Sequence, residues 1–357
     1  MEKVLIVLRH DAQDKPGGDT ALLTDIYTSL SNFDCTLVTG LPKSVVSFKF
    51  VVGCNLDRPI EGYELLKLCK KNSVPLHFMT LHHSSHNAMR NYLQDGLLGW
   101  KKVIAFLANY DPIKYEQFLW NIRVIISKVF KKHKLKYGNV AKAQNALIRE
   151  SEFLLVVSDK EIESIERDIG TIASKTIIFP HLLPSDPQEI IKDNQNKIIF
   201  CPGRIECRKN QLFILRVAEC MPELDFVFMG RINKSDRKFY NLFTRKVSKL
   251  KNVKVAQPLD IKEFKNYLMN SDVVLTASWF EVTSLIELDV LRKHKKLVCN
   301  SSSYNSSFFI NSLQYNFNDI SSCMNKINCA LNDDYSVLGS YPKNSTIINT
   351  YLDQIKS

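Results

Sequence analysis

The sequence predicts an α/β protein of two domains, each built on a parallel β-sheet, with a cleft between them. Its 357 residues exceed the usual length of a single domain. Val4–Arg9 is almost continuously apolar, which is typical of a strand in a parallel sheet that is covered on both faces. From Ile198 onward, strand-like and helix-like segments alternate, and such alternation demands a parallel sheet with crossover helices.

The first half of the chain begins with the strand Val4–Arg9 and continues into the loop His10–Asp19. This loop contains Gly17 and Gly18, and paired glycines after a first strand let a ligand approach the backbone closely. A flexible turn is the simpler alternative. We expect further strands at 35–39, 48–52, 74–81, 153–157 and 177–179, and helices at 20–30, 61–71, 139–150 and 158–169.

The boundary between the two halves is expected within Pro180–Asn196, because three prolines and several polar residues there are typical of a hinge. We place the first domain at 1–182, the hinge at 183–196, the second domain at 197–340 and a terminal helical segment at 341–357. In the second half we expect strands at 198–201, 225–229, 253–256 and 273–276, and helices at 211–220, 235–250 and 261–270.

The composition indicates a globular cytoplasmic protein. Hydrophobic residues make up 45% of the chain, and nine cysteines are dispersed without metal-ligand spacing. An odd, dispersed set favours a reducing compartment over a disulfide framework. The sequence shows neither a signal peptide nor an apolar run long enough to span a bilayer. These observations predict a cytoplasmic location.

The formal charge of +11 is concentrated between Lys101 and Lys142, where the only acidic residues are Asp111 and Glu116. Within this segment, Phe118–Lys136 has the periodicity of a basic amphipathic helix, with apolar residues that include Trp120. Such a helix favours an anionic membrane surface, and a plain solvated face is the alternative. Nucleic acid is disfavoured, because neither zinc-finger spacing nor an aromatic RNA-binding motif is present.

A cluster of histidines follows the predicted strand Val74–Leu81, beginning at His82. An imidazole at the carboxyl end of a parallel strand lies where α/β folds bind ligands. A metal site is the alternative for this cluster. It is disfavoured by the spacing of the histidines and by the lack of a supporting carboxylate.

The segment Ala277–Asp289 runs from a predicted strand through a polar loop into a predicted helix. Backbone N–H groups at such a helix N-terminus can hold an anion, so the groups near Thr283, Ser284 and Leu285 are candidate donors. Thr283 and Ser284 are also good helix caps. Glu281 precedes the helix and can lie beside a bound phosphate, whereas Asp289 can hydrogen-bond a pair of sugar hydroxyls. A charged helix after any buried strand is the simpler alternative.

A second strand-to-helix loop carries two cations, Arg204 and Lys209, behind the turn residue Gly203. Cations at this spacing suit a diphosphate, because charge-assisted hydrogen bonds to phosphate are strong. Taken singly, two surface cations are usually only solvated. The two loops in this order, each between a strand and a helix, make a stronger signal than either loop alone.

These two loops together resemble the retaining family 4 glycosyltransferases. Glu281 and Asp289 resemble the two acidic residues of the E-x7-E motif. Arg204 and Lys209 resemble the two basic residues of the G-R-x4-K element. The sequence departs from the pattern in three places. Thr283-Ser284 replaces Phe-Gly, Asn210 stands where glycine is commoner, and Lys-His-Lys-Lys at 293–296 replaces Gly-x-Pro. The loop with Gly17 and Gly18 and the sequence Thr80-Leu81-His82 resemble two further elements of the same enzymes.

The resemblance implies a GT-B fold of two Rossmann-like domains and a retaining hexosyltransferase that needs no metal and no cofactor. Its donor is a UDP- or GDP-linked sugar. Glu281 and His82 are the implied catalytic residues. The implied donor-binding residues are Arg204, Lys209, Thr283, Ser284, Leu285, Asp289, Gly17 and Gly18. The terminal helix is expected to cross back to the first domain.

The basic segment and the expected location suggest a glycan or lipid-linked oligosaccharide acceptor at an anionic inner-leaflet surface, as in bacterial O-antigen, capsule or lipopolysaccharide synthesis. Nucleic acid is not an expected partner. Two other classes of function stay open. One is another GT-B enzyme, such as a sugar epimerase or an inverting transferase, and the other is a non-catalytic nucleotide-sugar-binding or scaffold protein.

Overall fold

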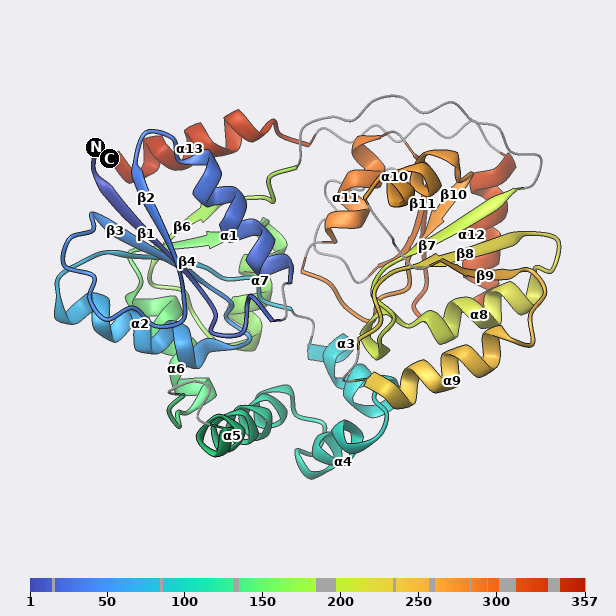
Figure 1. The fold of residues 1–357 in the computed structure, drawn as a ribbon, viewed down its shortest axis with the longest axis horizontal. Coiled ribbons are helices and arrows are strands. Elements are labelled where there is room, and N and C mark those ends of the chain that lie inside the picture. Colours follow the sequence, from blue (N-terminus) through green and yellow to red (C-terminus); the bar gives the residue numbers. More distant parts are fainter. Residues whose placement is uncertain are drawn as a thin grey trace. The chain divides into compact units, whose positions relative to one another are not determined.

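The computed structural model describes most of the chain (Figure 1). The described residues are 1–14, 17–83, 86–130, 135–183, 197–233, 236–256, 261–282, 284–293, 295–301, 313–332 and 341–356. They form two compact units. The first contains Met1–His86, Ile104–Leu182 and Pro342–Ser357, and the second contains Asn87–Val103 and Leu183–Tyr341.

The first unit is built on a six-stranded sheet in which all paired strands are parallel, in the order β2-β1-β3-β4-β5-β6. Its strands are β1 (Lys3–Leu8), β2 (Asp34–Thr39), β3 (Phe50–Cys54), β4 (Leu76–Met79), β5 (Phe153–Val156) and β6 (Lys175–Ile178). The inner strands β1, β3, β4 and β5 are apolar and buried because helices cover both faces of the sheet, whereas the edge strands β2 and β6 are partly exposed. Its helices are α1 (Gly18–Ser29), α2 (Pro59–Lys71), α5 (Pro112–Phe130), α6 (Val140–Glu150), α7 (Asp159–Asp168) and α13 (Asn344–Lys356).

Helix α13 belongs to the first unit although it ends the chain. Its Tyr351 is fully buried, and the hydroxyl lies 2.6 Å from Nδ1 of His77 on β4. His77 also stacks on Phe50 of β3 with ring centroids 4.3 Å apart. Burial lowers the pKa of His77 to about 3, so the ring is neutral and acts as part of the core. This aromatic packing ties the C-terminal helix to the first sheet.

The second unit repeats the plan with a sheet in the order β12-β11-β10-β7-β8-β9, again with parallel pairing. Figure 1 shows α8 and α9 on one side of this sheet and α10 and α11 on the other. The strands are β7 (Ile198–Pro202), β8 (Asp225–Met229), β9 (Val253–Ala256), β10 (Val273–Leu275), β11 (Leu297–Asn300) and β12 (Leu313–Tyr315). The helices are α8 (Gln211–Cys220), α9 (Arg237–Val247), α10 (Ile261–Asn270), α11 (Leu285–Arg292) and α12 (Ile320–Asn332), with a 3-10 turn at Cys207–Lys209.

One segment inside the range expected for the first domain groups with the second unit. This segment, Asn87–Val103, carries all but the first residue of α3 (His86–Asn91), the π-helical turn Tyr92–Gly96 and the start of α4 (Trp100–Leu107). Tyr92 and Leu98 pack against the core of the second unit, and Lys101 forms an ion pair with buried Asp236. These contacts hold the segment there.

The two-domain α/β prediction is confirmed, since each unit is a parallel sheet covered by helices on both faces. The expected basic helix is also present, but as α5, whose described part is Pro112–Phe130. Residues 131–134 and the hinge residues 184–196 lie outside the described part of the chain. Trp120, one of the apolar residues of the predicted amphipathic helix, packs inside the first unit and does not face outward. Its ring is 1% exposed and packs with Ile60 and Val140, while its Nε1 donates to the Lys136 carbonyl at 3.0 Å.

None of the described helices is both long and apolar enough to cross a membrane.

Candidate donor site in the second unit

The two motif loops follow neighbouring strands of the second sheet. Strands β7 and β10 pair in parallel, with Val273 opposite Ile199 and Val274 opposite Phe200. The chain leaves β7 toward β8 on one side, and β10 continues to β11 on the other. This is the topological switch point of the sheet, where ligands of doubly wound folds bind beyond the carboxyl ends of the strands. The topology therefore brings the loops 203–210 and 276–284 together at one edge.

The loop after β7 is shaped by two residues with positive φ. Gly203 has φ +140°, a conformation that favours glycine. Asn210 has φ 53° and ψ 35°, the left-handed conformation that asparagine tolerates better than most residues. Its side-chain amide also donates to Oδ1 of Asn318 at 3.1 Å. Asparagine at position 210 therefore allows the left-handed turn that ends this loop.

Glu281, on the loop after β10, is 5% exposed and contacts two cations of the other loop. Arg208 Nη1 donates to its Oε2 at 2.8 Å, and Lys209 Nζ forms an ion pair with its Oε1. Burial alone would raise the pKa of this carboxyl, but the charges of Arg208 and Lys209 outweigh burial and hold the pKa well below its usual range. Glu281 is therefore a carboxylate throughout the physiological range of pH.

Arg208 reaches Glu281 because its loop is held against the partner loop. The amide of Trp279 donates to the Arg208 carbonyl at 2.9 Å, and Arg208 Nη1 lies 3.3 Å from the Phe280 carbonyl oxygen. The guanidinium carbon also lies 5.8 Å from the centre of the Phe280 ring. Arg208 thus joins the two loops and neutralises Glu281 at the same time.

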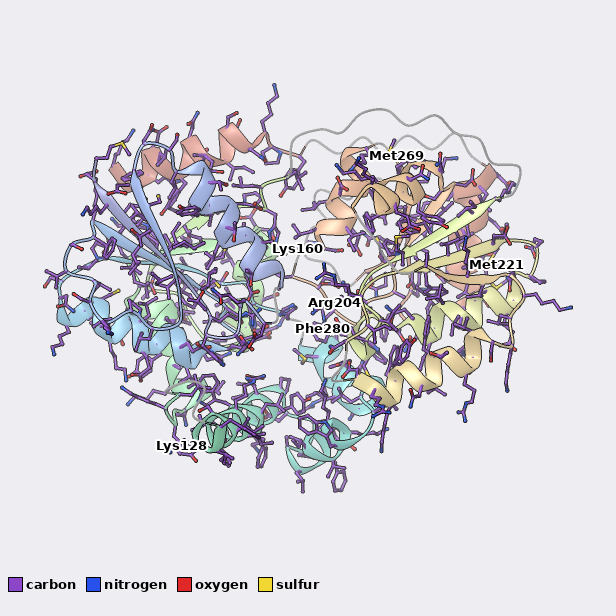
Figure 2. All side chains as sticks on the ribbon, viewed as in Figure 1. Lys128, Lys160, Arg204, Met221, Met269 and Phe280 are labelled. Carbon is purple, nitrogen blue, oxygen red and sulfur yellow. The ribbon has the colours of Figure 1, made fainter. Side chains whose placement is uncertain are left out.

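Arg204 stands apart from this buried group, as its side chain is 49% exposed. Its Nη2 lies 3.3 Å from Oε1 of Glu206, a carboxylate that is itself buried and accepts from Asn233 Nδ2 at 2.8 Å. Figure 2 labels Arg204 and Phe280 near one another on the second unit. Of the two expected phosphate-binding cations, Arg204 is half exposed and paired with Glu206, and Lys209 is paired with Glu281.

Helix α11 begins at Leu285, with Ser284 as its cap. The Ser284 hydroxyl accepts from the amide of Glu287 at 3.4 Å, which leaves the first backbone N–H groups of the helix at the end that faces the loop. Asp289, expected to hold sugar hydroxyls, forms an ion pair with Lys293 one turn further along its own helix. Thr283 lies outside the described residues.

Glu287 is buried on the face of α11 that packs against the sheet. Its Oε1 accepts from Thr276 Oγ1 at 2.6 Å. Burial raises the pKa of Glu287 to about 7, the Thr276 hydroxyl opposes the rise, and the nearby Glu281 charge adds to it. A cavity of about 10 Å³, lined by Lys209, Thr276, Ser278 and Ser284 among others, adjoins this end of the sheet. Glu287 is thus a carboxyl that holds a proton near neutral pH next to the motif loops.

His82 belongs to the first unit, and both of its ring nitrogens lie close to carboxylates. Nδ1 is 2.6 Å from Asp57 Oδ1, and Nε2 is 3.2 Å from Asp168 Oδ2. Burial disfavours the charged ring, but the carboxylates of Asp57 and Asp168 prevail and raise its pKa to about 10. Below it, Glu161 accepts from the His82 amide and from Thr80 Oγ1, both at 2.6 Å. His82 is thus a charged imidazolium at the end of β4, held between the carboxylates of Asp57 and Asp168.

Gly17 and Gly18 start helix α1. A Cβ atom at Gly17 would lie 2.8 Å from Asp19 Oδ1 and 3.3 Å from Arg9 Nη2, because Asp19 turns back to pair with Arg9 at 2.5 Å. A Cβ at Gly18 would meet open space. Lys15 and Pro16 of the same loop lie outside the described residues.

The structure brings Lys209 and Glu281 into contact and places Arg204, Ser284 and Leu285 on the same pair of loops. His82, Gly17 and Gly18 belong to the first unit. Sequence reasoning missed Arg208, although its place beside Lys209 in a motif loop was a usable signal. It also missed Asp57 and Asp168, which no spacing connects with His82. Among the described residues, no group of three or more histidine, cysteine or acidic side chains is arranged to hold a metal ion.

Solved structures with the same fold are known. Sucrose-phosphate synthase from Thermosynechococcus elongatus superposes with a TM-score of 0.71 at 10% identity, over 100% of this chain and 98% of that chain. Anabaena HepE in complex with UDP and glucose gives 0.63 at 11% identity, over 100% of both chains. A UDP-forming trehalose-phosphate synthase from Burkholderia vietnamiensis gives 0.58 at 9%, over 100% of this chain and 96% of that chain.

The protein therefore has the GT-B fold, as predicted. No protein-family model and no curated protein sequence matches the chain.

Proposed function

We propose that the protein is a retaining, metal-independent glycosyltransferase of the family 4 type that uses a nucleotide-activated hexose. The observation that carries the proposal is the contact between two loops at the switch point of the second sheet, where Arg208 and Lys209 meet Glu281. HepE, whose structure has the same fold, has been solved in complex with UDP and with UDP-glucose. This likeness supports a UDP-linked donor, and a GDP-linked donor is the alternative.

The donor diphosphate would lie across the carboxyl ends of β7 and β10. The Arg204 side chain is already half exposed, and the N–H groups that follow Ser284 at the start of α11 are placed to bind an anion. Lys209 would turn from Glu281 toward the phosphates. Fixed donors of this kind stabilise the charge that develops on the leaving group, and in many enzymes this is the largest contribution to catalysis.

Arg208 makes this exchange feasible. When Lys209 turns to the diphosphate, Glu281 would otherwise be a buried charge without a counter-ion, which is costly. The Arg208 contact at 2.8 Å keeps the carboxylate neutralised and oriented. Glu281 is then available to hydrogen-bond the hydroxyls of the transferred sugar, the role that its place in the motif suggests.

The acceptor is proposed to be a glycan or a lipid-linked oligosaccharide of bacterial surface-polysaccharide synthesis. Support comes from the basic helix α5, whose exposed lysines fit an enzyme at an anionic inner leaflet. A cytoplasmic protein that binds the membrane peripherally fits this acceptor. Residues 131–134 of the predicted basic helix lie outside the described residues.

A non-catalytic nucleotide-sugar-binding protein is the second candidate, favoured by one observation. Asp289, which the resemblance assigns to the donor, is paired with Lys293 on its own helix. In an enzyme of the predicted type, Asp289 would leave Lys293 to bind the donor. In a binding protein that holds the donor through other residues, the ion pair between Asp289 and Lys293 could stay intact.

The test combines binding with product analysis. A thermal-shift screen against UDP, GDP and their hexose conjugates identifies the donor, because a ligand of the native state raises the melting temperature. The matched donor is then incubated with lipid-linked and soluble glycan acceptors in excess chelator, and the anomeric configuration of the product is read by NMR. Transfer with retention supports the proposal. Donor binding without transfer or hydrolysis favours the binding protein, and an inverted product or an epimerised donor favours another GT-B enzyme.

A further inference from the structure

Helix α5 of the first unit is apolar on two opposite sides. Its inner side buries Trp120 and Val124 in a cluster with Ile60, Val140 and Ala143. Its other side carries five large apolar residues that are exposed, here named the outer face of α5: Phe118, Ile125, Ile126, Val129 and Phe130. A soluble helix normally buries one apolar stripe and shows a polar surface on the other side. Packing of the first unit therefore explains only half of the apolar surface of this helix.

The exposure of the outer face is large. Val129 and Phe130 are each 69% exposed, and most of the large exposed apolar side chains among the described residues lie between Trp100 and Tyr137. Phe118, Ile125 and Val129 are spaced by seven and four residues, so they share one stripe of the helix. Phe106 and Leu107 in the last turn of α4 are also exposed, at 66% and 64%. An exposed apolar stripe such as that on α5 marks an interaction site.

Positive charge borders the outer face. Lys114 and Lys128 are exposed on α5, and Figure 2 shows Lys128 on this helix. The Lys128 ammonium lies 4.3 Å from the centre of the Tyr137 ring, which is itself half exposed. Of the two acidic residues in this segment, Glu116 is paired with Arg123. The surroundings of the apolar stripe are therefore cationic.

We propose that the outer face of α5 docks on an anionic phospholipid bilayer, with the helix lying in the plane of the interface. An apolar stripe flanked by lysines is the pattern of helices that insert their apolar side at the headgroup boundary, while lysine ammonium groups bind lipid phosphates. A second copy of the chain is the less suitable occupant, since a symmetric contact would bring the same lysines of both copies together.

Docking through the outer face of α5 would bring the enzyme to a lipid-linked acceptor. Only the identity of this acceptor rests on the proposed function. Docking through α5 involves none of the residues assigned to the donor. Lipid binding and donor binding can therefore be measured separately on the same protein.

The experiment is a flotation assay of the full chain with phosphatidylcholine vesicles and with vesicles that also contain phosphatidylglycerol. The apolar variant carries Ile125→Ser, Val129→Ser and Phe130→Ser, and its control carries Leu41→Ser and Val46→Ser, two exposed apolar positions elsewhere in the same unit. The charge variant carries Lys114→Gln and Lys128→Gln, and its control carries Lys43→Gln and Lys71→Gln, which are also exposed. Melting temperatures and UDP-induced shifts are recorded for all proteins.

The wild type and both controls should float with anionic vesicles, and salt should weaken their binding. The apolar variant should lose at least five-sixths of the bound fraction and the charge variant at least half, with unchanged UDP-induced shifts. The proposal is overturned if the wild type does not float, if neutral vesicles bind as well as anionic ones, or if both variants bind like their controls. Self-association that the apolar variant abolishes would assign the face to a second copy. If UDP does not raise the melting temperature of the wild type, that result would instead count against the proposed function.

Discussion

Arg208 and Glu281 form an ion pair of 2.8 Å that joins the loop after β7 to the loop after β10. Lys209 contacts the other oxygen of the same carboxylate. One buried acid therefore has two counter-ions, and only one of these, Lys209, occupies the position expected to bind the donor diphosphate. The contact suggests that Arg208 stays paired with Glu281 when Lys209 turns to the donor diphosphate.

We predict that Arg208→Gln weakens UDP binding about tenfold, because Lys209 would then be the only cation left to neutralise Glu281. This corresponds to about 1.4 kcal/mol, within the range for hydrogen bonds to charged groups. Isothermal titration calorimetry with UDP measures it.

The double variant Arg208→Gln, Glu281→Gln serves as the control, since removal of the buried acid frees Lys209. UDP affinity should return to within about threefold of the wild type while turnover stays low, a coupling that a double-mutant cycle detects. If the double variant binds UDP no better than Arg208→Gln, then Arg208 has a merely structural role.

We predict that Arg204→Ala and Lys209→Ala each lower turnover at least tenfold. Each removes a charge-assisted contact to the diphosphate worth roughly 1.5–3 kcal/mol. Lys251→Ala, at an exposed position, is the matched control and should leave turnover unchanged. Steady-state kinetics with a saturating acceptor decide the matter, and near-normal activity in both variants would refute the phosphate assignment.

We predict that Glu287 makes the protein less stable as the pH rises. Its pKa is about 7 in the folded state, above the unfolded value of about 4.3. Between these pH values the folded state binds more protons than the unfolded state. The stabilising contribution of Glu287 is therefore fully present below about pH 4.3 and is lost as the pH rises through about 7. The melting temperature of Glu287→Gln should therefore exceed that of the wild type at pH 8 by more than it does at pH 5.

The exposed position Glu223 supplies the control, and Glu223→Gln should show no such pH-dependent difference. Equal differences at both pH values for Glu287→Gln would mean that Glu287 is ionised in the folded protein.

We predict that the contribution of His82 to stability also falls as the pH rises, but over a higher range of pH. Its folded pKa of about 10 lies above the unfolded value of about 6.5, so its stabilising effect is complete below about pH 6.5 and is lost as the pH rises through about 10. His82→Gln should lower the free energy of unfolding most at pH 6, since it leaves Asp57 and Asp168 without their shared cation. Denaturant titrations at pH 6 and pH 9.5 test this, and a cost that does not shrink at the higher pH would argue against a charged His82.

Part of the candidate site could be predicted because it depends on local order along the chain. A strand followed by a polar loop and a helix is visible in the apolar periodicity around Ile198–Pro202 and Val273–Leu275. The cations and acids in these loops then stand at fixed spacings. The alternation of strands and helices predicts parallel strands, but the strand order that places β10 beside β7, and so brings Lys209 to Glu281, is a property of the folded sheet.

The sequence by itself determined the fold class, most strands and helices, and the loops at the switch point, because apolar periodicity and loop chemistry are properties of neighbouring residues. Only the tertiary structure decided which charges neutralise one another. It paired Arg208 with Glu281, clamped His82 between Asp57 and Asp168, gave Asp289 to Lys293, and buried Trp120 rather than exposing it. The physical reason is that ion pairing and burial depend on distances between residues far apart in the chain, and these distances arise only when the sheets and helices pack.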